Sequence, residues 1–246
     1  MGHFFFKEFS VKQDRSAMKV NTDGVLLGAW CSLPNGTEKK PVFVTDVGTG
    51  TGVIALMVAQ RLYGIGVECS IDGIDPDDPS AVEAGENFNL SPWRESLISL
   101  PLSFSDYMSS NPLKRDLIVS NPPYFTNSLK APCSRRSKAR HNDSLSFSEL
   151  ANYSERLLSP NGTLSIILPS DGERDFISAA TEAGLSLSRI CRVSTITGES
   201  PRRVMMEFAK EDRGGVNEER LSVQESPSGS FTDRYKALTS AFYLKF

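Results

Sequence analysis

A short apolar stretch, followed two residues later by two consecutive prolines, constrains the fold of this chain more than any other feature. Residues 117–119 (Leu-Ile-Val) predict a buried strand. The two consecutive prolines that follow, at positions 122 and 123, neither continue a strand nor lie inside a helix. The chain is therefore expected to turn outward in a stiff, extended conformation, at the end of a strand where open α/β sheets place their ligand crevice.

That turn presents an amide side chain, a backbone carbonyl and an aromatic ring. These groups suit a planar amide or amino-purine nitrogen better than they suit a nucleophile or a metal ion. We therefore predict a catalytic, substrate-orienting role for Asn121, Pro122, Pro123 and Tyr124.

A glycine-rich turn follows an earlier predicted strand and leads into a predicted helix over residues 53–63. Glycines at alternate positions, 48, 50 and 52, let the backbone bend tightly and approach a ligand closely. Their spacing differs from the G-x-G-x-x-G of dinucleotide-binding folds. Glycines in such turns are often present only because the backbone conformation requires them, without a ligand. Asp46 and Asp75, at the ends of this strand and the next, strengthen the case, because an acid at the second strand's end is placed to accept ribose hydroxyls. Each aspartate taken singly is also a common loop or capping residue.

Two further regions extend the predicted cofactor site. Asp106 closes a third predicted strand, residues 97–104, and is a candidate acceptor for an adenine amino group; a simple helix cap explains it equally well. Asn21, Thr22 or Asp23 caps a predicted helix, whose dipole favours an anionic group near its start. The cofactor-site candidates are Thr22, Asp23, Asp46, Gly48, Thr49, Gly50, Gly52, Asp75 and Asp106.

The later part of the chain continues this alternation of strands and helices. The patterns predict helices over residues 145–158 and 171–183, a strand over 163–168 between them, and a hairpin of strands 186–195 and 203–210. This order predicts an α/β fold, a doubly wound, mostly parallel seven-stranded sheet with an antiparallel C-terminal hairpin.

The length of 246 residues fits a single domain over residues 1–246. Within it, residues 1–40 are expected to form an N-terminal extension that contributes to the cofactor site. Residues 211–246 are expected to form a C-terminal tail that is charged at first and ends in a short docking helix.

A basic loop over residues 125–142 stands out against the net charge of −3. No acidic residue occurs between Asp116 and Asp143. This concentration of positive charge has two interpretations: a solvated loop, or a flexible arm that binds the phosphates of a polyanion. The overall charge does not indicate a nucleic-acid binder, so any such role depends on this local patch. The candidate RNA contacts are Lys130, Arg135, Arg136, Lys138, Arg140 and His141.

The four cysteines are scattered without C-x-x-C spacing, which argues against a disulfide framework or a zinc site. The aromatic N-terminus contains no apolar run long enough for a signal peptide or a membrane span. We therefore expect a cytoplasmic protein with no metal, no membrane association and no obligate protein partner.

Residues 46–52 and 121–124 together resemble the class I S-adenosylmethionine-dependent methyltransferases, which have a Rossmann-like fold. A narrower resemblance connects the chain with the bacterial tRNA (adenine-N6)-methyltransferases that modify adenosine 37, immediately 3′ of the anticodon of valine tRNA. It is carried by residues 18–30, by Ser-Pro-Trp at 91–93, by Ala-Arg-His at 139–141 and by the Phe-Tyr-Leu-Lys-Phe end at 242–246. The chain departs from the pattern at residues 75–79 (Asp-Pro-Asp-Asp-Pro), where such families usually have an alanine in place of the second proline.

The resemblance implies a cofactor, S-adenosyl-L-methionine, and a substrate, tRNA. It implies that the glycines approach the methionine part, that Asp46 or the region of Asp23 meets its ammonium group, that Asp75 binds the ribose, and that Asp106 binds the adenine. In the same way, the carbonyls of Asn121 and Pro122 would accept the two N–H bonds of the target N6, and Tyr124 would stack on the base.

Other substrates present the same chemistry. Related enzymes methylate glutamine side chains of release factors or guanine N2 of ribosomal RNA, and an amide NH2 offers the same two donors as adenine. The basic loop argues against a protein substrate. A non-enzymatic RNA-binding module would leave the Asn-Pro-Pro-Tyr turn unexplained.

Overall fold

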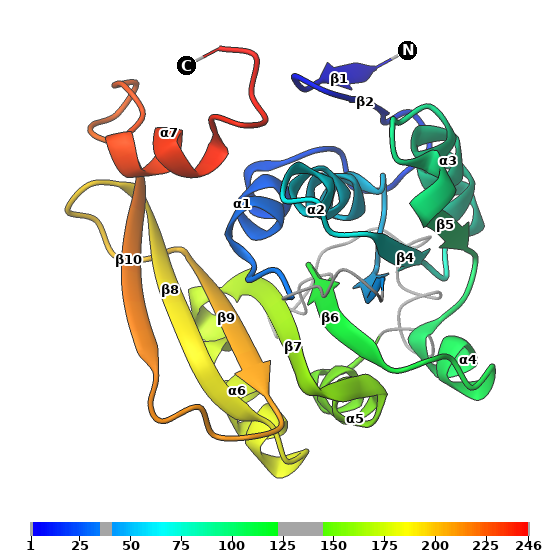
Figure 1. The fold of residues 1–246 in the computed structure, drawn as a ribbon. Coiled ribbons are helices and arrows are strands. Elements are labelled where there is room, and N and C mark those ends of the chain that lie inside the picture. The colour runs from blue at the N-terminus through cyan, green and yellow to red at the C-terminus, as the bar shows by residue number, and fades with distance from the viewer. Residues whose placement is uncertain (1, 35–40, 123–144, 246) are drawn as a thin grey trace, which may run out of the picture.

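The computed structural model describes residues 2–34, 41–122 and 145–245 and consists of one large sheet with helices on both faces (Figure 1). The strands of that sheet are β3 (Val42–Val47), β4 (Cys69–Ile74), β5 (Leu97–Leu100), β6 (Arg115–Ser120), β7 (Leu158–Pro169), β8 (Ser186–Ile196), β9 (Arg203–Ala209) and β10 (Asn217–Gln224). The helices are α1 (Thr22–Trp30), α2 (Val53–Gly64), α3 (Asp78–Asn89), α4 (Phe104–Ser109), α5 (Phe147–Leu157), α6 (Glu173–Glu182) and α7 (Asp233–Thr239), with short 3-10 turns η1 (Arg94–Ser96) and η2 (Ser170–Gly172). A separate antiparallel pair, β1 (His3–Phe5) and β2 (Ser10–Lys12), lies at the N-terminus.

The eight strands of the sheet run in the order β10-β8-β9-β7-β6-β3-β4-β5. Strand β9 is antiparallel to β7 and β8, and the other neighbours are parallel. The predicted doubly wound, mostly parallel sheet with an antiparallel hairpin is therefore confirmed.

The predicted number of seven strands is wrong, because β10 adds an edge strand where a charged tail was expected. Of its eight residues only Leu221 is buried, so the segment lacks the apolar pattern of an inner strand. Ion pairs from Arg189 to Glu219 and from Arg192 to Glu218 join it to β8.

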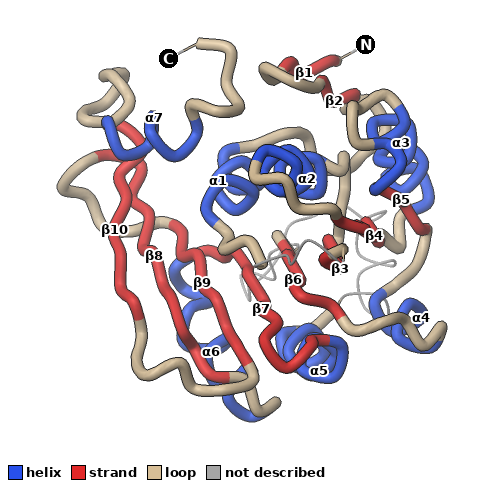
Figure 2. The backbone as a smooth tube through the Cα atoms, in the orientation of Figure 1, coloured by secondary structure: helices blue, strands red, loops and turns tan. Residues whose placement is uncertain are grey.

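Alternate side chains of strands β6 and β9 enter two different cores, so both faces of these strands carry apolar residues. On β6, Leu117 and Val119 pack in the core beneath α1 and α2, whereas Ile118 packs in the core with α5 and α6. On β9, Met205 and Met206 divide between the two cores in the same way. Figure 2 shows the two groups of helices on the two sides of the strands.

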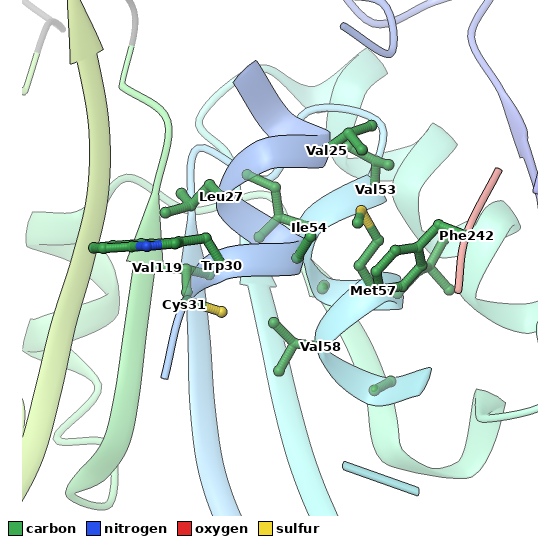
Figure 3. Close-up of a cluster of buried hydrophobic side chains, with 14 of the residues drawn as sticks. Val25, Leu27, Trp30, Cys31, Val53, Ile54, Met57, Val58, Val119 and Phe242 are labelled. Carbon is green, nitrogen blue, oxygen red and sulfur yellow. The ribbon is translucent and has the colours of Figure 1, made fainter. Parts of the chain in front are cut away.

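Helix α1 packs closely against α2. A Cβ added at Gly28 would lie 2.9 Å from Met57 Sδ, so the small residue permits this close approach. Figure 3 shows side chains of both helices in this core together with Phe242, near the other end of the chain. Lys7 N also donates to Phe242 O at 2.8 Å, so the N-terminal and C-terminal segments lie side by side.

Within residues 2–34, 41–122 and 145–245, no helix has the length and apolar character needed to cross a membrane. The same part of the chain contains no group of three or more His, Cys, Asp or Glu side chains arranged to hold a metal ion. Cys31, Cys69 and Cys191 are buried free thiols.

Candidate cofactor and substrate site

The pairing of the central strands brings three predicted site segments to one edge of the sheet. Val47, the last residue of β3, pairs with Ile74 of β4 on one side and with Ser120 of β6 on the other. The crossovers that start from β3 lead to β4 and β5 on one side, and the chain then returns to β6 on the other side. The gap beyond β3 and β6 is thus the topological switch point, where open α/β sheets bind ligands.

Gly48, Asp75 and Asn121 each follow one of these three paired residues in the chain. All three line one cavity of about 800 Å³. That volume lies in the range of small-molecule and cofactor sites. Of the predicted residues, the cavity is lined by Gly48, Thr49, Gly50, Asp75, Asp106, Asn121 and Pro122.

The three glycines of the turn have positive φ angles of +73° at Gly48, +55° at Gly50 and +81° at Gly52, a region that disfavours other residues. The three glycines differ in what an added Cβ would contact. A Cβ added at Gly52 would lie 2.5 Å from Cε1 of Phe88, so this glycine permits the packing of α3. At Gly48 no described atom lies within 4 Å of an added Cβ, so this glycine leaves the cavity wall open for a close approach.

Asp46 lies beneath the glycine turn and not in the cavity wall. It is fully buried, and its Oδ2 accepts hydrogen bonds from Thr49 Oγ1 at 2.7 Å and from Ala55 N at 3.2 Å. Burial raises the pKa of Asp46 to about 7, although these two hydrogen bonds oppose the shift. The carboxyl thus ties the turn to the first residues of α2.

Asp75 faces the cavity and also fixes the turn. Its Oδ2 accepts from Gly50 N at 2.9 Å, and its Oδ1 accepts from Asp77 N at 2.9 Å. Burial raises the pKa of Asp75 above its usual range. The unusual second proline, Pro79, fits because it lies in the first turn of α3, which Asp77 caps by accepting from Ser80 N.

The predicted position of Asp106 at the end of a strand is wrong, although the residue does line the cavity. Strand β5 ends at Leu100, and Asp106 lies in the first turn of α4. Ser103 is the cap of this helix: its Oγ accepts from Asp106 N and donates to the Asp106 carboxylate at 2.7 Å. The buried Phe104 extended the apparent strand in the sequence, but it begins the helix.

The N-terminal segment forms one wall of the cavity through Ser16, Ala17, Met18 and Lys19, which sequence reasoning did not single out as cofactor contacts. It is held there by Glu83 of α3, which is 2% exposed and accepts from the backbone N–H groups of residues 14, 15 and 16 at 2.7–3.0 Å. Asn87, one turn further along α3, bonds both Lys12 O and Thr51 O. The same helix thus fastens the N-terminal segment and the glycine turn.

Asn121 and Pro122 leave β6 directly into the cavity and are both buried. The Asn121 Nδ2 lies 3.9 Å from Sδ of Met18, so the amide is close to the N-terminal wall. Glu149 and Tyr153 of α5, which the sequence did not indicate, complete the lining on the far side. The remaining predicted catalytic and RNA-binding residues lie outside the described residues: Pro123, Tyr124, Lys130, Arg135, Arg136, Lys138, Arg140 and His141.

Thr22 and Asp23 line a second cavity of about 690 Å³, not the one with the glycine turn. Asn21, not either of these residues, caps α1 by accepting from Gly24 N at 2.9 Å. Asp23 Oδ2 pairs with Arg203 Nε at 2.8 Å. The cofactor-binding role predicted for these two residues therefore stays a prediction. The start of α1, where they lie, faces the ends of β8 and β10 and the start of β9.

Sequence comparison finds relatives that all carry the same name. The chain is 43% identical over 245 residues to a tRNA1(Val) (adenine(37)-N6)-methyltransferase of Bacteroides fragilis, covering 98% of both chains. It is 37% identical over 242 residues to the protein of that name from Flavobacterium psychrophilum, covering 98% of this chain and 99% of the relative. A third relative of the same name, from Tolumonas auensis, is 36% identical over 245 residues, covering 99% of this chain and 98% of its own length. No protein-family model matches the chain.

Solved structures share the fold at low sequence identity. A protein from Agrobacterium tumefaciens, described as a predicted O-methyltransferase, superposes with a TM-score of 0.64 at 17% identity, covering 89% of this chain and 96% of that one. A Listeria monocytogenes protein, described as a candidate class I S-adenosylmethionine-dependent methyltransferase, has a TM-score of 0.54 at 18% identity over 88% of this chain and 65% of that one. These likenesses support the class I methyltransferase fold.

Proposed function

The chain belongs to the family of tRNA1(Val) (adenine(37)-N6)-methyltransferases, and from that premise we propose that its 800 Å³ cavity binds S-adenosyl-L-methionine beside the target adenosine. The reaction is methyl transfer to the exocyclic N6 of adenosine 37 of valine tRNA. The cofactor supplies the electrophilic methyl group when it is bound.

The cavity has the features that this cofactor requires. Gly48 offers a wall on which no side chain stands, which suits the close approach of the methionine part. Asp75 presents a carboxylate at the end of β4, the position from which such folds bind ribose hydroxyls. Asp106 and Ser103 lie on the rim beyond β5 as candidate partners for the adenine.

Asn121 and Pro122 are proposed to orient the target nitrogen. The N6 of adenine is a poor nucleophile because its lone pair is delocalised into the ring. The side-chain carbonyl of Asn121 and the backbone carbonyl of Pro122 would each accept one N–H bond, which directs the remaining lone pair toward the methyl group. No strong base is needed before transfer, because the nitrogen becomes acidic only after it carries the methyl group.

The rest of the Asn-Pro-Pro-Tyr turn and the basic loop complete the proposal. Tyr124 would stack on the flipped base, an interaction worth roughly 1–3 kcal/mol in other base-binding proteins. Lys130, Arg135, Arg136, Lys138, Arg140 and His141 are proposed to hold the phosphates on either side. An anticodon-loop purine is already partly unstacked, which lowers the cost of flipping it.

The observation that carries this proposal is that Gly48, Asp75 and Asn121 follow one row of paired residues and line the same cavity. The test is incubation of the protein with methyl-labelled S-adenosylmethionine and total tRNA from a strain that lacks it, followed by nucleoside analysis. We expect labelled N6-methyladenosine. Labelled N2-methylguanosine, or methylglutamine in a parallel protein fraction, would contradict the proposal.

A further inference from the structure

The second cavity is separate from the cofactor cavity in its lining but touches it. It lies where the start of α1 meets the ends of β8 and β10 and the start of β9. Among the residues that the structure describes, only Met18 and Asn21 line both cavities. Met18 is also the residue whose Sδ lies 3.9 Å from Asn121 Nδ2, so the second cavity begins one side chain away from the proposed catalytic amide.

Part of the lining of this cavity is apolar. Leu26 and Val193 are buried and form part of it with Met18 and Val223, whereas Phe231 is 39% exposed. The position of the Phe231 ring is fixed by the bridge between Gln224 and Phe231 and by stacking on Tyr235 at 5.2 Å between ring centroids. A partly exposed aromatic ring in the lining of a cavity offers a surface on which a planar base can stack.

Another part of the lining is polar, and its described residues carry a net positive charge. Arg202 and Arg203 contribute two cations, and Asp23 contributes one anion that pairs with Arg203. Arg202 is exposed, and within the described residues its guanidinium makes no hydrogen bond or ion pair. Thr22, Thr195 and Gln224 add hydroxyl and amide groups to the lining.

An aromatic surface, an apolar floor and a cation within one cavity are what a single nucleotide of an unpaired RNA strand requires, with its base stacked and its phosphate neutralised. Such a nucleotide must also be covalently connected to the adenosine that reaches Asn121. The contact between Met18 and Asn121 provides that continuity, because the two cavities meet there.

We propose that this second cavity binds a nucleotide of the substrate RNA adjacent to the methylated adenosine, with its base against Phe231 and its phosphate on Arg202. The proposal rests on the proposed function, since it assigns a subsite to the same RNA substrate. It makes α1, β8 and β10 part of the RNA interface, in addition to the basic loop.

The first test measures equilibrium binding of valine tRNA transcript to the Arg202→Ala protein. We expect the Kd for tRNA to rise about threefold to tenfold and the slope of log K against log salt to fall by about 0.7, the value for one single-strand phosphate contact. The Kd for S-adenosylmethionine should stay unchanged. Arg174→Ala is the matched control, because Arg174 is exposed on α6 and lines neither cavity.

The second test uses Phe231→Leu, which keeps an apolar side chain but removes the ring. Ligated valine tRNAs that lack the base immediately 5′ or 3′ of the target adenosine serve as probes. We expect Phe231→Leu to weaken binding fivefold or more, one of the two abasic tRNAs to do the same with the wild-type protein, and the combination to cause no further loss.

The proposal is overturned if Arg202→Ala binds tRNA with the wild-type Kd and salt slope, or if neither abasic tRNA shows coupling with Phe231→Leu. These failures differ from failure of the proposed function, in which the wild-type protein does not methylate the intact tRNA at all. Wild-type methylation of the same transcript therefore accompanies every binding measurement.

Discussion

Replacement of Gly48 by alanine separates cofactor binding from backbone strain, because the chain contains a matched control. Gly48 and Gly66 both have φ of +73°, and at neither does any described atom lie within 4 Å of an added Cβ. Gly48 lines the main cavity, whereas Gly66 lies in the exposed turn between α2 and β4. The two substitutions therefore impose the same local strain and differ only in what the new methyl group faces.

The expected magnitudes follow from this geometry. A left-handed conformation costs an alanine about 1–2 kcal/mol, so both variants should lose that much unfolding free energy. At Gly48 the methyl group also occupies space against which the cofactor would pack. Overpacking by one methyl group costs typically 1–3 kcal/mol, which corresponds to a cofactor Kd about fivefold to a hundredfold higher.

The assay is urea unfolding of both variants together with isothermal titration of S-adenosylmethionine into each folded protein. We expect equal losses of stability and a loss of affinity for Gly48→Ala alone. Equal cofactor Kd values for the two variants would refute the assignment of Gly48 to the cofactor wall. A much larger stability loss for Gly48→Ala would refute the reasoning from the backbone.

Three further outcomes follow from the structure. Gly52→Ala should lower the free energy of unfolding, measured in urea, by about 2–5 kcal/mol, clearly more than Gly66→Ala. The new methyl group would lie 2.5 Å from Phe88, and the backbone at this position also has a φ of +81°. Equal losses in the two variants would contradict this prediction. The raised pKa of Asp46, about 7 against 3.8, means that the native state binds more protons than the unfolded state between these pH values, so this carboxyl lowers stability as the pH rises through that window. Asp46→Asn keeps an oxygen that accepts from Thr49 and Ala55 but removes the titrating carboxyl group. Urea unfolding at several pH values should therefore show the unfolding free energy of this variant, relative to wild type, rising by a few kcal/mol from about pH 4 to pH 8. A difference that does not change with pH would contradict the raised pKa of Asp46. Glu83→Gln replaces one of the two oxygens that accept hydrogen bonds from the backbone N–H groups of residues 14–16. The amide hydrogens of these residues should therefore exchange faster, and the cofactor Kd should rise. Unchanged exchange would contradict the role of Glu83 in holding the N-terminal wall.

The sequence was sufficient to bring Gly48, Asp75 and Asn121 together at the candidate site, because parallel strands align their carboxyl ends. Gly48, Asp75 and Asn121 each follow a predicted strand. Once these strands are read as parallel neighbours, the residues after them must meet at one edge of the sheet. The glycine spacing and the proline pair mark where the chain leaves the sheet. Local patterns were sufficient for this part of the fold.

The parts that the sequence did not reveal depend on contacts between distant residues. Glu83 and its backbone partners are 67–69 residues apart along the chain, so nothing local marks that carboxylate as the anchor of the N-terminal wall. Strand β10 has the polar composition of a tail because it lies at the edge of the sheet. The ion pair between Asp23 and Arg203 joins residues that are 180 positions apart in the sequence, so no local pattern predicts it.

The most direct test of the central claim is single-turnover methyl transfer to valine tRNA by Asn121→Ala, measured together with the Kd of S-adenosylmethionine. If Asn121 orients the target nitrogen, the rate of N6-methyladenosine formation at position 37 should fall roughly a hundredfold or more, by analogy with the loss of a preorganised hydrogen bond at a reacting centre. The cofactor Kd should stay within about twofold of the wild-type value, because Gly48 and Asp75 remain in place. A wild-type rate, or an equal loss of cofactor binding and methyl transfer, would contradict the account.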